Sequence, residues 1–561
     1  MRLHWLPRPS SFAPPYYRSQ VYASWKTRRC YSDEQGGKSL TLARRRITEG
    51  QISFTLQRAE KVKAVIEKKS KKSKERSSKT PHNVQDQTRK QKTEQALWFS
   101  HPSSPGSPIF TPGGTYVIQK LQAFLRAQYA EYGFQEVITP LMYKRSLWEQ
   151  SGHWENYKDD MYSVHSGKQS SDKSGDNTFG LKPMNCPGHC VLFSKQRWSY
   201  NDLPVRYADF SPLHRDEVSG ALSGLTRVRR FHQDDGHIFC RPSQIENEIA
   251  SCLSFTDTVY RTLGIEDYEL VLSTRPDKDF IGTREEWTQA ERQLKDALDR
   301  FGRPWRYQRG EGAFYGPKID FIVLDSVGKS HQIGTTQLDF QLPKRFGLKY
   351  AAPAKVEGSS GTMAEDGISF EPVMIHRAIF GSLERFLALF IDKHDGQWPF
   401  WLNPNPVAVL TVTDDQGVRE MATRVAQNLR YPMSKRPDSE LGDPFTFGLP
   451  LPLSEAATFT PVHLNTSDET LGKKLVLTKD KGTGLIVIIG QRNVKDNTVD
   501  VQVSAVLEPK KVWSAIEEIK PGSQAPIKKD TGTGKARGQP GVKLSVVEFQ
   551  KLSKNLADAY I

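Results

Sequence analysis

The chain has 561 residues, a formal net charge of +15 and a hydrophobic content of 37%. This length allows a large domain with one or two smaller ones, and the low hydrophobic content predicts segments outside any compact core. The basic charge favours a polyanionic partner such as nucleic acid, although much of it lies in the first hundred residues. Five unpatterned cysteines argue for a reducing compartment, and no apolar run reaches the ~18–20 residues of a membrane span.

The N-terminal residues 1–32 contain no acidic residue and carry arginines, serines and aromatic residues, which is typical of a mitochondrial transit peptide. An unstructured basic arm is the alternative. Residues 33–95 are polar and include a lysine-rich run from Lys68 to Lys79, which predicts a basic, partly disordered extension. We therefore expect the mature chain to act in the mitochondrial matrix.

Globular patterns begin at about residue 96, with a helix expected over Tyr116–Tyr132 and a strand pattern that ends at Pro140. Apolar residues at helical spacing follow a strand in residues 373–392. Four further helices are expected at Pro242–Thr262, Glu285–Phe301, Val418–Leu429 and Ser545–Tyr560. Polar or glycine-rich stretches predict loops or insertions at Ser166–Thr178, Ala351–Gly367, Pro432–Thr470 and Lys520–Gly541.

The stretch Asp209–Cys240 is rich in residues that can carry chemistry and reads DFSPLHRDEVSGALSGLTRVRRFHQDDGHIFC. Two β-prone halves flank the small and polar residues Ser219–Gly224, which predicts two antiparallel strands joined by a flexible loop. Arg215, Arg227 and Arg229 are spaced so that their guanidinium groups can bind phosphates bidentately. The alternative is a solvated basic hairpin.

This stretch resembles motif 2 of class II aminoacyl-tRNA synthetases, and QDDGHIFC at Gln233–Cys240 resembles threonyl-tRNA synthetases in particular. The helix, glycine, strand and proline before residue 140 resemble motif 1, which builds the class II dimer interface, and PVMIHRAIFGSLERF resembles motif 3. The resemblance runs from Trp98 to the C-terminus and is weaker beyond Asp392.

The resemblance implies an α+β fold in which residues 96–402 form a class II antiparallel sheet with flanking helices. A smaller α/β anticodon-binding domain with insertions is implied for residues 403–561, and a homodimer is expected. Residues 33–95 are too few and too polar for the N-terminal editing domain of full-length family members.

The resemblance also implies an ATP-dependent ligase that activates L-threonine, with Mg²⁺ accompanying ATP, and transfers it to the 3′ end of tRNA(Thr). Such an enzyme mainly positions its reactants and stabilises spreading negative charge. The implied ATP-binding residues are Arg215, Glu217, Arg227, Phe231, Gln332, Thr335 and Arg385. The implied catalytic residues are Arg215, Arg385, Lys318 and His153, the last of them in the transfer step.

Cys186, His237 and His376 lie far apart in the sequence and form no local metal motif, but they match the zinc ligands of the family. A thiolate and two imidazoles leave an open position on a tetrahedral Zn²⁺ ion. The resemblance implies that threonine chelates this zinc through its amino and hydroxyl groups, so that valine, which lacks the hydroxyl, is rejected. The implied threonine-binding residues are Asp235, Tyr315, Gln233 and Gln337.

Three positions depart from the family pattern, namely Arg230, Ser223 and Ile333. Two other interpretations stay open at this point. One is a catalytically inactive class II-like protein that binds only RNA or a partner. The other is a related ligase for proline or serine, which would share the arginines but not this placement of one cysteine and two histidines.

Overall fold

The structure is a computed structural model that describes residues 96–165, 178–278, 280–353, 362–364, 367–430, 460–523 and 541–561. The expected transit peptide, the basic extension, and most of the expected loops and insertions lie outside the described residues. Among the helices that are described, none is long and apolar enough to cross a membrane.

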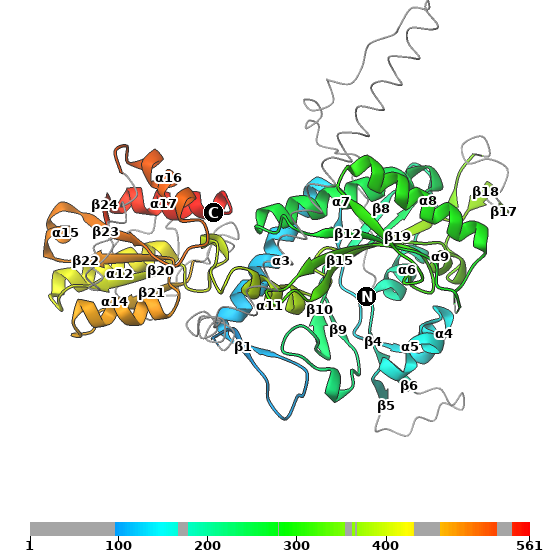
Figure 1. Ribbon diagram of the computed structural model, residues 1–561, viewed down its shortest axis with the longest axis horizontal. Coiled ribbons are helices and arrows are strands. Elements are labelled where there is room, and N and C mark those ends of the chain that lie inside the picture. The colour runs from blue at the N-terminus through cyan, green and yellow to red at the C-terminus, as the bar shows by residue number, and fades with distance from the viewer. Residues whose placement is uncertain are drawn as a thin grey trace, which may run out of the picture. The chain divides into compact units, whose positions relative to one another are not determined.

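The larger part of the fold is an eight-stranded sheet (Figure 1) with the order β13-β12-β14-β15-β19-β11-β8-β3. The six strands from β12 to β8 pair antiparallel, and only the outermost strands, β13 and β3, pair parallel. In sheet order the strands are Trp305–Gln308, Glu269–Ser273, Lys318–Leu324, Ser330–Asp339, Val373–Ala378, Asp235–Cys240, Val205–Asp209 and Gln135–Glu136. The predicted antiparallel sheet with flanking helices is confirmed.

Two amphipathic helices, α7 (Ile245–Thr262) and α8 (Arg284–Phe301), lie side by side along the sheet (Figure 1). Both bury apolar side chains at helical spacing in the main hydrophobic cluster, together with residues of the sheet. Since the sheet is covered, every residue of β11 and β19 is buried. These two central strands therefore hold their side chains in a fixed register.

Helix α3 (Pro112–Tyr132) begins one turn before the helix expected from the sequence, because Thr111 caps it and accepts a hydrogen bond from the backbone N–H of Gly114. The helix ends at Gly133, whose φ of 69° requires the left-handed conformation that glycine favours. The strand expected up to Pro140 forms only in β3. Thr139 instead donates its backbone N–H and hydroxyl to the carboxylate of Asp209.

The expected hairpin is present, with β9 (Pro212–His214) paired antiparallel to β10 (Arg230–His232). Its connecting loop contains a short 3-10 turn, η2 (Ser219–Ala221). Helix α11 (Leu383–Lys393) follows β19 and begins at Ser382, whose hydroxyl accepts from the backbone N–H of Arg385. The segments that resemble motif 2 and motif 3 thus form a hairpin and a strand–helix unit, as expected.

Smaller elements complete this part of the chain. The prediction of a loop over Ala351–Gly367 is wrong in part. Within it, β17 (Thr362–Ala364) pairs with β18 (Gly367–Phe370) in a four-stranded sheet. The other short strands are Trp98–Phe99, Ile109–Phe110, Met142–Lys144, Ser163–His165, Thr178–Leu181, Trp198–Ser199 and Tyr350–Ala351. The short helices are α4 (Arg145–Gln150), α5 (His153–Tyr157), α6 (Cys186–Ser194) and α9 (Gln341–Arg345).

A five-stranded mixed sheet with its own hydrophobic cluster is built from residues after 400. Its order is β21-β20-β22-β23-β24, with strands at Val462–Asn465, Val407–Thr411, Leu485–Ile489, Thr498–Val503 and Val542–Ser545. Its helices are α12 (Gln416–Arg430), α14 (Leu471–Asp480), α15 (Gln491–Asp496), α16 (Pro509–Ile519) and α17 (Val546–Asp558). This confirms the expected smaller α/β fold.

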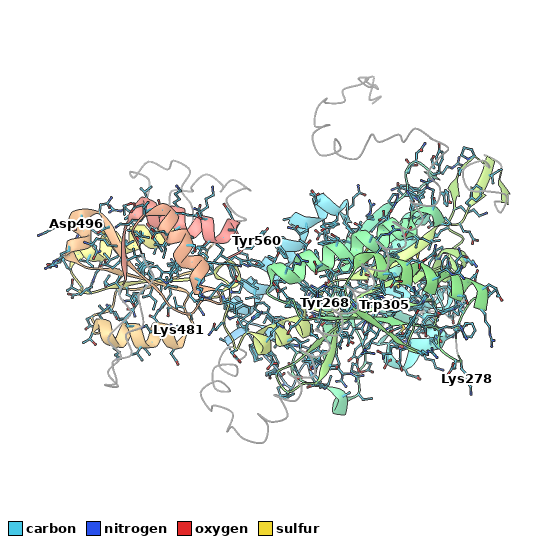
Figure 2. All side chains as sticks on the ribbon, turned by 45° about the horizontal axis from the view of Figure 1, so that its top comes forward. Tyr268, Lys278, Trp305, Lys481, Asp496 and Tyr560 are labelled. Carbon is cyan, nitrogen blue, oxygen red and sulfur yellow. The ribbon has the colours of Figure 1, made fainter. Side chains whose placement is uncertain are left out.

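Several of these elements were not expected from the sequence, and β21 and α14 are two of them. Strand β21 lies within the polar segment that was expected to be an insertion, and it pairs parallel with β20 at the sheet edge. Helix α14 follows it, and Lys481, labelled in Figure 2 together with Asp496 at the end of α15, lies directly after that helix. Only part of the side chains in these two elements are buried, so their apolar pattern is weak.

Candidate active site

A cavity of about 280 Å³ lies where the hairpin meets β11, β15 and β19. It is lined by every site residue implied by the family resemblance except His153. Arg229, which was also expected to bind phosphates, does not line it and donates from Nε to the backbone carbonyl of Glu217 at 2.8 Å. The cavity thus gathers side chains from segments that are up to 228 residues apart, since Tyr157 and Arg385 both line it. The arrangement divides into a part rich in arginines and a part that holds cysteine and histidines.

Three arginines converge at the first part of the cavity. The Arg215 guanidinium lies 5.0 Å from the centre of the Phe231 ring, and its buried Nε has no hydrogen-bond partner among the described residues. Arg385 donates from Nε to the carbonyl of Thr226 at 2.9 Å. Burial, and then the charges of Arg215 and Arg227, lower the pKa of Arg385. An anionic ligand here would relieve the repulsion between these cations and satisfy the unpartnered donor.

Glu217 and Arg227 pair across the hairpin loop, with Arg227 Nη2 2.7 Å from the Glu217 carboxylate. On the opposite wall, Gln332 and Thr335 both donate to one carboxylate oxygen of Asp320, at 2.6 and 3.1 Å. Lys318 Nζ lies 2.9 Å from the other oxygen. Asp320 therefore orders three predicted site residues, although it was not predicted from the sequence. The alternation Lys318, Ile319, Asp320 along a strand could have placed it on the same face as Lys318.

The second part of the cavity brings Cys186, His237 and His376 together, with one ligand atom from each lying within 4.8 Å of the others. His237 and His376 are direct partners across β11 and β19, which places His237 Nε2 3.1 Å from His376 Nδ1. Two zinc–nitrogen bonds at a tetrahedral angle separate their nitrogens by roughly 3.3 Å. The three donors therefore fit a zinc ion.

The outer ring nitrogens of both histidines are engaged. His376 Nε2 lies 2.8 Å from a carboxylate oxygen of Asp339, and His237 Nδ1 lies 2.8 Å from His189 Nδ1. Such contacts hold a histidine with its other nitrogen aimed at a metal. Burial raises the pKa of the Cys186 thiol well above its usual value and lowers the pKa of His237 well below it. A cation bound among them would offset the cost of a buried thiolate.

Beside these ligands lie the residues predicted to bind threonine. Asp235 accepts a hydrogen bond from Asn185 Nδ2 at 3.1 Å, and burial raises the pKa of its carboxyl. The Tyr315 ring lies 5.2 Å from the His376 ring. Gln233 and Gln337 donate to the backbone carbonyls of Gly381 and Gly316, at 2.6 and 3.1 Å respectively. Asn185, which immediately precedes Cys186, was not singled out from the sequence.

His153 is placed differently from the other predicted site residues. It is fully buried, with Nδ1 2.8 Å from the Ser151 hydroxyl and Nε2 3.7 Å from the sulfur of Cys186. Burial lowers its pKa to about 3. Gly152, with φ of 78°, turns the chain so that the histidine ring at the start of α5 points inward. In this structure His153 supports Cys186 rather than lining the cavity.

The cavity of convergent arginines lies on antiparallel strands, between a hairpin and a strand–helix unit. This arrangement defines a class II aminoacyl-tRNA synthetase core. The family model described as tRNA synthetase class II core domain (G, H, P, S and T) matches residues 162–394. The chain is 43% identical over 423 residues to a probable mitochondrial threonine–tRNA ligase of Schizosaccharomyces pombe, covering 75% of this chain and 85% of that protein. The chain belongs to the threonine–tRNA ligases.

Other comparisons agree with this membership. The mitochondrial threonine–tRNA ligase of Saccharomyces cerevisiae is 44% identical over 412 residues, which are 72% of this chain and 83% of that protein. Among solved structures, the RNA binding domain of threonyl-tRNA synthetase from Cryptosporidium parvum aligns with a TM-score of 0.65 at 35% identity. That alignment covers 83% of this chain and 97% of the other.

Proposed function

We propose that the cavity is the synthetic site at which this threonine–tRNA ligase activates L-threonine with ATP and Mg²⁺ and then charges tRNA(Thr). The chain is an ATP-dependent ligase of mitochondrial translation, as its mitochondrial relatives are named, and it acts in the matrix. The proposal depends mainly on one observation, which is that three arginines and a Cys/His/His cluster line the same cavity.

The arginine-rich part would bind the nucleotide. Phe231 offers a ring face for adenine, and Glu217 lies in the hairpin loop beside it. Arg215, with its unpartnered Nε, would donate to the α-phosphate, where charge develops as the carboxylate attacks. Arg385 would hold the terminal phosphate from the opposite wall. These residues orient ATP and stabilise charge, and no covalent step on the protein is required.

The cysteine and histidine part would select the amino acid. Cys186, His237 and His376 are the residues that would hold zinc, which when bound supplies a Lewis-acid position for a substrate amine and hydroxyl. Asp235 would accept the hydroxyl proton in a hydrogen bond, and Tyr315 would lie against the amino group. A buried site that hydrogen-bonds a hydroxyl discriminates strongly against an analogue without one.

The organisation of the chain is also proposed. The transit peptide would be residues 1–32, the basic extension 33–95, the catalytic domain 96–402 and the anticodon-binding domain 403–561. A homodimer is supported by the short outer strand β3 and by Ile138, which follows it and is 90% exposed. An exposed apolar side chain beside an unpaired strand edge favours pairing with a second copy.

The experiment is aminoacylation of transcribed tRNA(Thr), tRNA(Pro) and tRNA(Ser) with labelled amino acids and ATP. Threonine should be attached to tRNA(Thr) alone. Attachment of proline or serine to its own tRNA would favour the related ligases. A folded protein that binds tRNA but charges none would favour the inactive class II-like alternative.

A further inference from the structure

His232 joins the hairpin to helix α11 through two contacts with one carboxylate. Its backbone N–H donates to Glu384 Oε2 at 2.9 Å, and its ring Nδ1 lies 2.9 Å from Oε1 of the same residue. Glu384 is fully buried in the first turn of α11. His232 directly follows Phe231, and Glu384 directly precedes Arg385. The contact therefore joins the chain neighbours of two residues that line opposite walls of the proposed nucleotide site.

Arg230 contacts this histidine from the other side. Its Nη2 lies 3.1 Å from His232 Nε2. A guanidinium can only donate, so Nε2 must present its lone pair, and Nδ1 then carries the proton that faces Glu384. Along β10, Arg230 and His232 point to one face while Phe231 points to the other, toward the cavity. Arg230, which departs from the family pattern, thus contacts His232 and does not line the cavity.

The hairpin uses such polar links because most of its buried apolar residues lie outside the main core. Leu213, Val228 and Phe231 form a cluster of their own, whereas Leu225 of the connecting loop and the buried face of α11 belong to the large cluster. A small separate cluster fixes the orientation of a hairpin poorly. The distance between Phe231 and Arg385 is therefore set largely by polar contacts between hairpin and helix, which also include the hydrogen bond from Arg385 Nε to the carbonyl of Thr226.

We propose that His232 and Glu384 form a positioning pair that holds the two walls of the ATP site in register, and that Arg230 selects the histidine tautomer this pair needs. The inference rests on the proposed nucleotide site. His232, Glu384 and Arg230 would not contact the substrate themselves. Their action is indirect, through the placement of Phe231 and Arg385.

The test uses two substitutions that separate the nitrogens of His232. His232→Asn keeps an amide donor near the position of Nδ1, whereas His232→Gln places its amide near Nε2 and removes the ring donor to Glu384. The full chain is assayed by threonine-dependent exchange of pyrophosphate into ATP. We expect His232→Gln to raise KM for ATP and lower kcat, together by roughly 10–100-fold in kcat/KM, with KM for threonine and zinc content within about twofold.

His232→Asn should keep kcat/KM for ATP within about fivefold of the wild type, a rescue that a purely space-filling role would not show. Arg230→Gln leaves Glu384 and its donors in place and should raise KM for ATP by a smaller factor than His232→Gln. His394→Gln is the matched control, because His394 also joins two elements, through Leu263 at 3.1 Å, but lies outside the cavity. It should lower the melting temperature without changing either KM.

Equal loss in the Asn and Gln variants of His232 would overturn the proposal. So would a lowered melting temperature with unchanged KM for ATP, or a parallel rise in KM for threonine. Should His232→Gln fail to fold, Arg230→Gln decides the matter, since an unchanged KM for ATP in that variant contradicts the tautomer role. A wild-type chain without threonine-dependent exchange would instead refute the proposed function, so the two failures are distinguishable.

Discussion

Several site residues are understandable only when their neighbours in space are known. His237 and His376 are separated by 139 residues and become partners through the register of β11 and β19. Resemblance to a family identified them, whereas spacing along the chain could not. His153 shows the limit of that method, because matching its motif could not reveal that the ring is buried behind Cys186. Asp320 was missed because its role is to order Gln332, Thr335 and Lys318 rather than to match a motif.

Arg215→Ala should lower kcat for threonine activation by about 100- to 1000-fold, the magnitude typical of losing a preorganised donor to developing charge. The reason is that Arg215 offers a buried Nε with no partner among the described residues. Its side chain faces the cavity, so the melting temperature should stay within about 2 °C of the wild type. Pyrophosphate exchange and a thermal melt are the measurements. Near-normal exchange would remove Arg215 from the site.

Cys186→Ser should reduce both bound zinc and threonine activation sharply, because a hydroxyl is a poor replacement for a thiolate ligand. Cys190→Ser is the matched control. Cys190 is fully buried in the same helix, and its sulfur lies 3.8 Å from Met374 rather than in the metal cluster. Metal analysis of both purified variants should find zinc in the control only. Equal zinc content in the two variants would exclude Cys186 as a ligand.

At the scale of elements, helices with strong apolar periodicity could be predicted well, and their ends less well. Helix α8 matches its expected range closely because it carries a wide apolar stripe, a capping box at Thr283 and a glycine at its end. Strand β21 and helix α14 were missed because their apolar patterns are short and interrupted. Strand β3 is shorter than expected because the side chain of Asp209 takes the donors of Thr139.

Ser545→Ala should destabilise the five-stranded part of the chain by about 1 kcal/mol. Ser545 caps α17 by accepting from the backbone N–H of Glu548, and Glu548 accepts in return from the backbone N–H of Ser545. Ser514→Ala, at an exposed position inside α16, is the control and should change stability by less than about 0.5 kcal/mol. Denaturant unfolding measures both. Equal effects would show that the capping box contributes nothing specific.

At the scale of the whole molecule, histidines with lowered pKa values make folding stability depend on pH. Partial desolvation lowers the pKa of the half-buried His214 and His394, and of the more exposed His463, below the usual value for histidine. The unfolded chain then binds more protons than the folded chain below a pH of about 6.5, so stability is lost as the pH falls. Thermal melts at constant ionic strength should show a lower melting temperature at pH 5.5 than at pH 7.5. A melting temperature that stays constant or rises would contradict this.

The choice of amino acid is a property of the whole enzyme. Serine keeps the amine and the hydroxyl that a zinc ion would bind and lacks only a methyl group, which is worth about 1–3 kcal/mol of discrimination. Valine has the shape of threonine but lacks the hydroxyl. The cluster of Cys186, His237 and His376 should therefore allow measurable activation of serine and exclude valine. Comparison of the three amino acids separates selection by the hydroxyl from selection by shape.

The most direct measurement is amino-acid-dependent pyrophosphate exchange by the full chain, with zinc bound, after removal by a chelator, and after zinc is restored. We expect exchange with threonine, weaker exchange with serine and none with valine, and we expect zinc removal to abolish exchange reversibly. Full threonine activation by the metal-free chain, or valine activation equal to that of threonine, would contradict it.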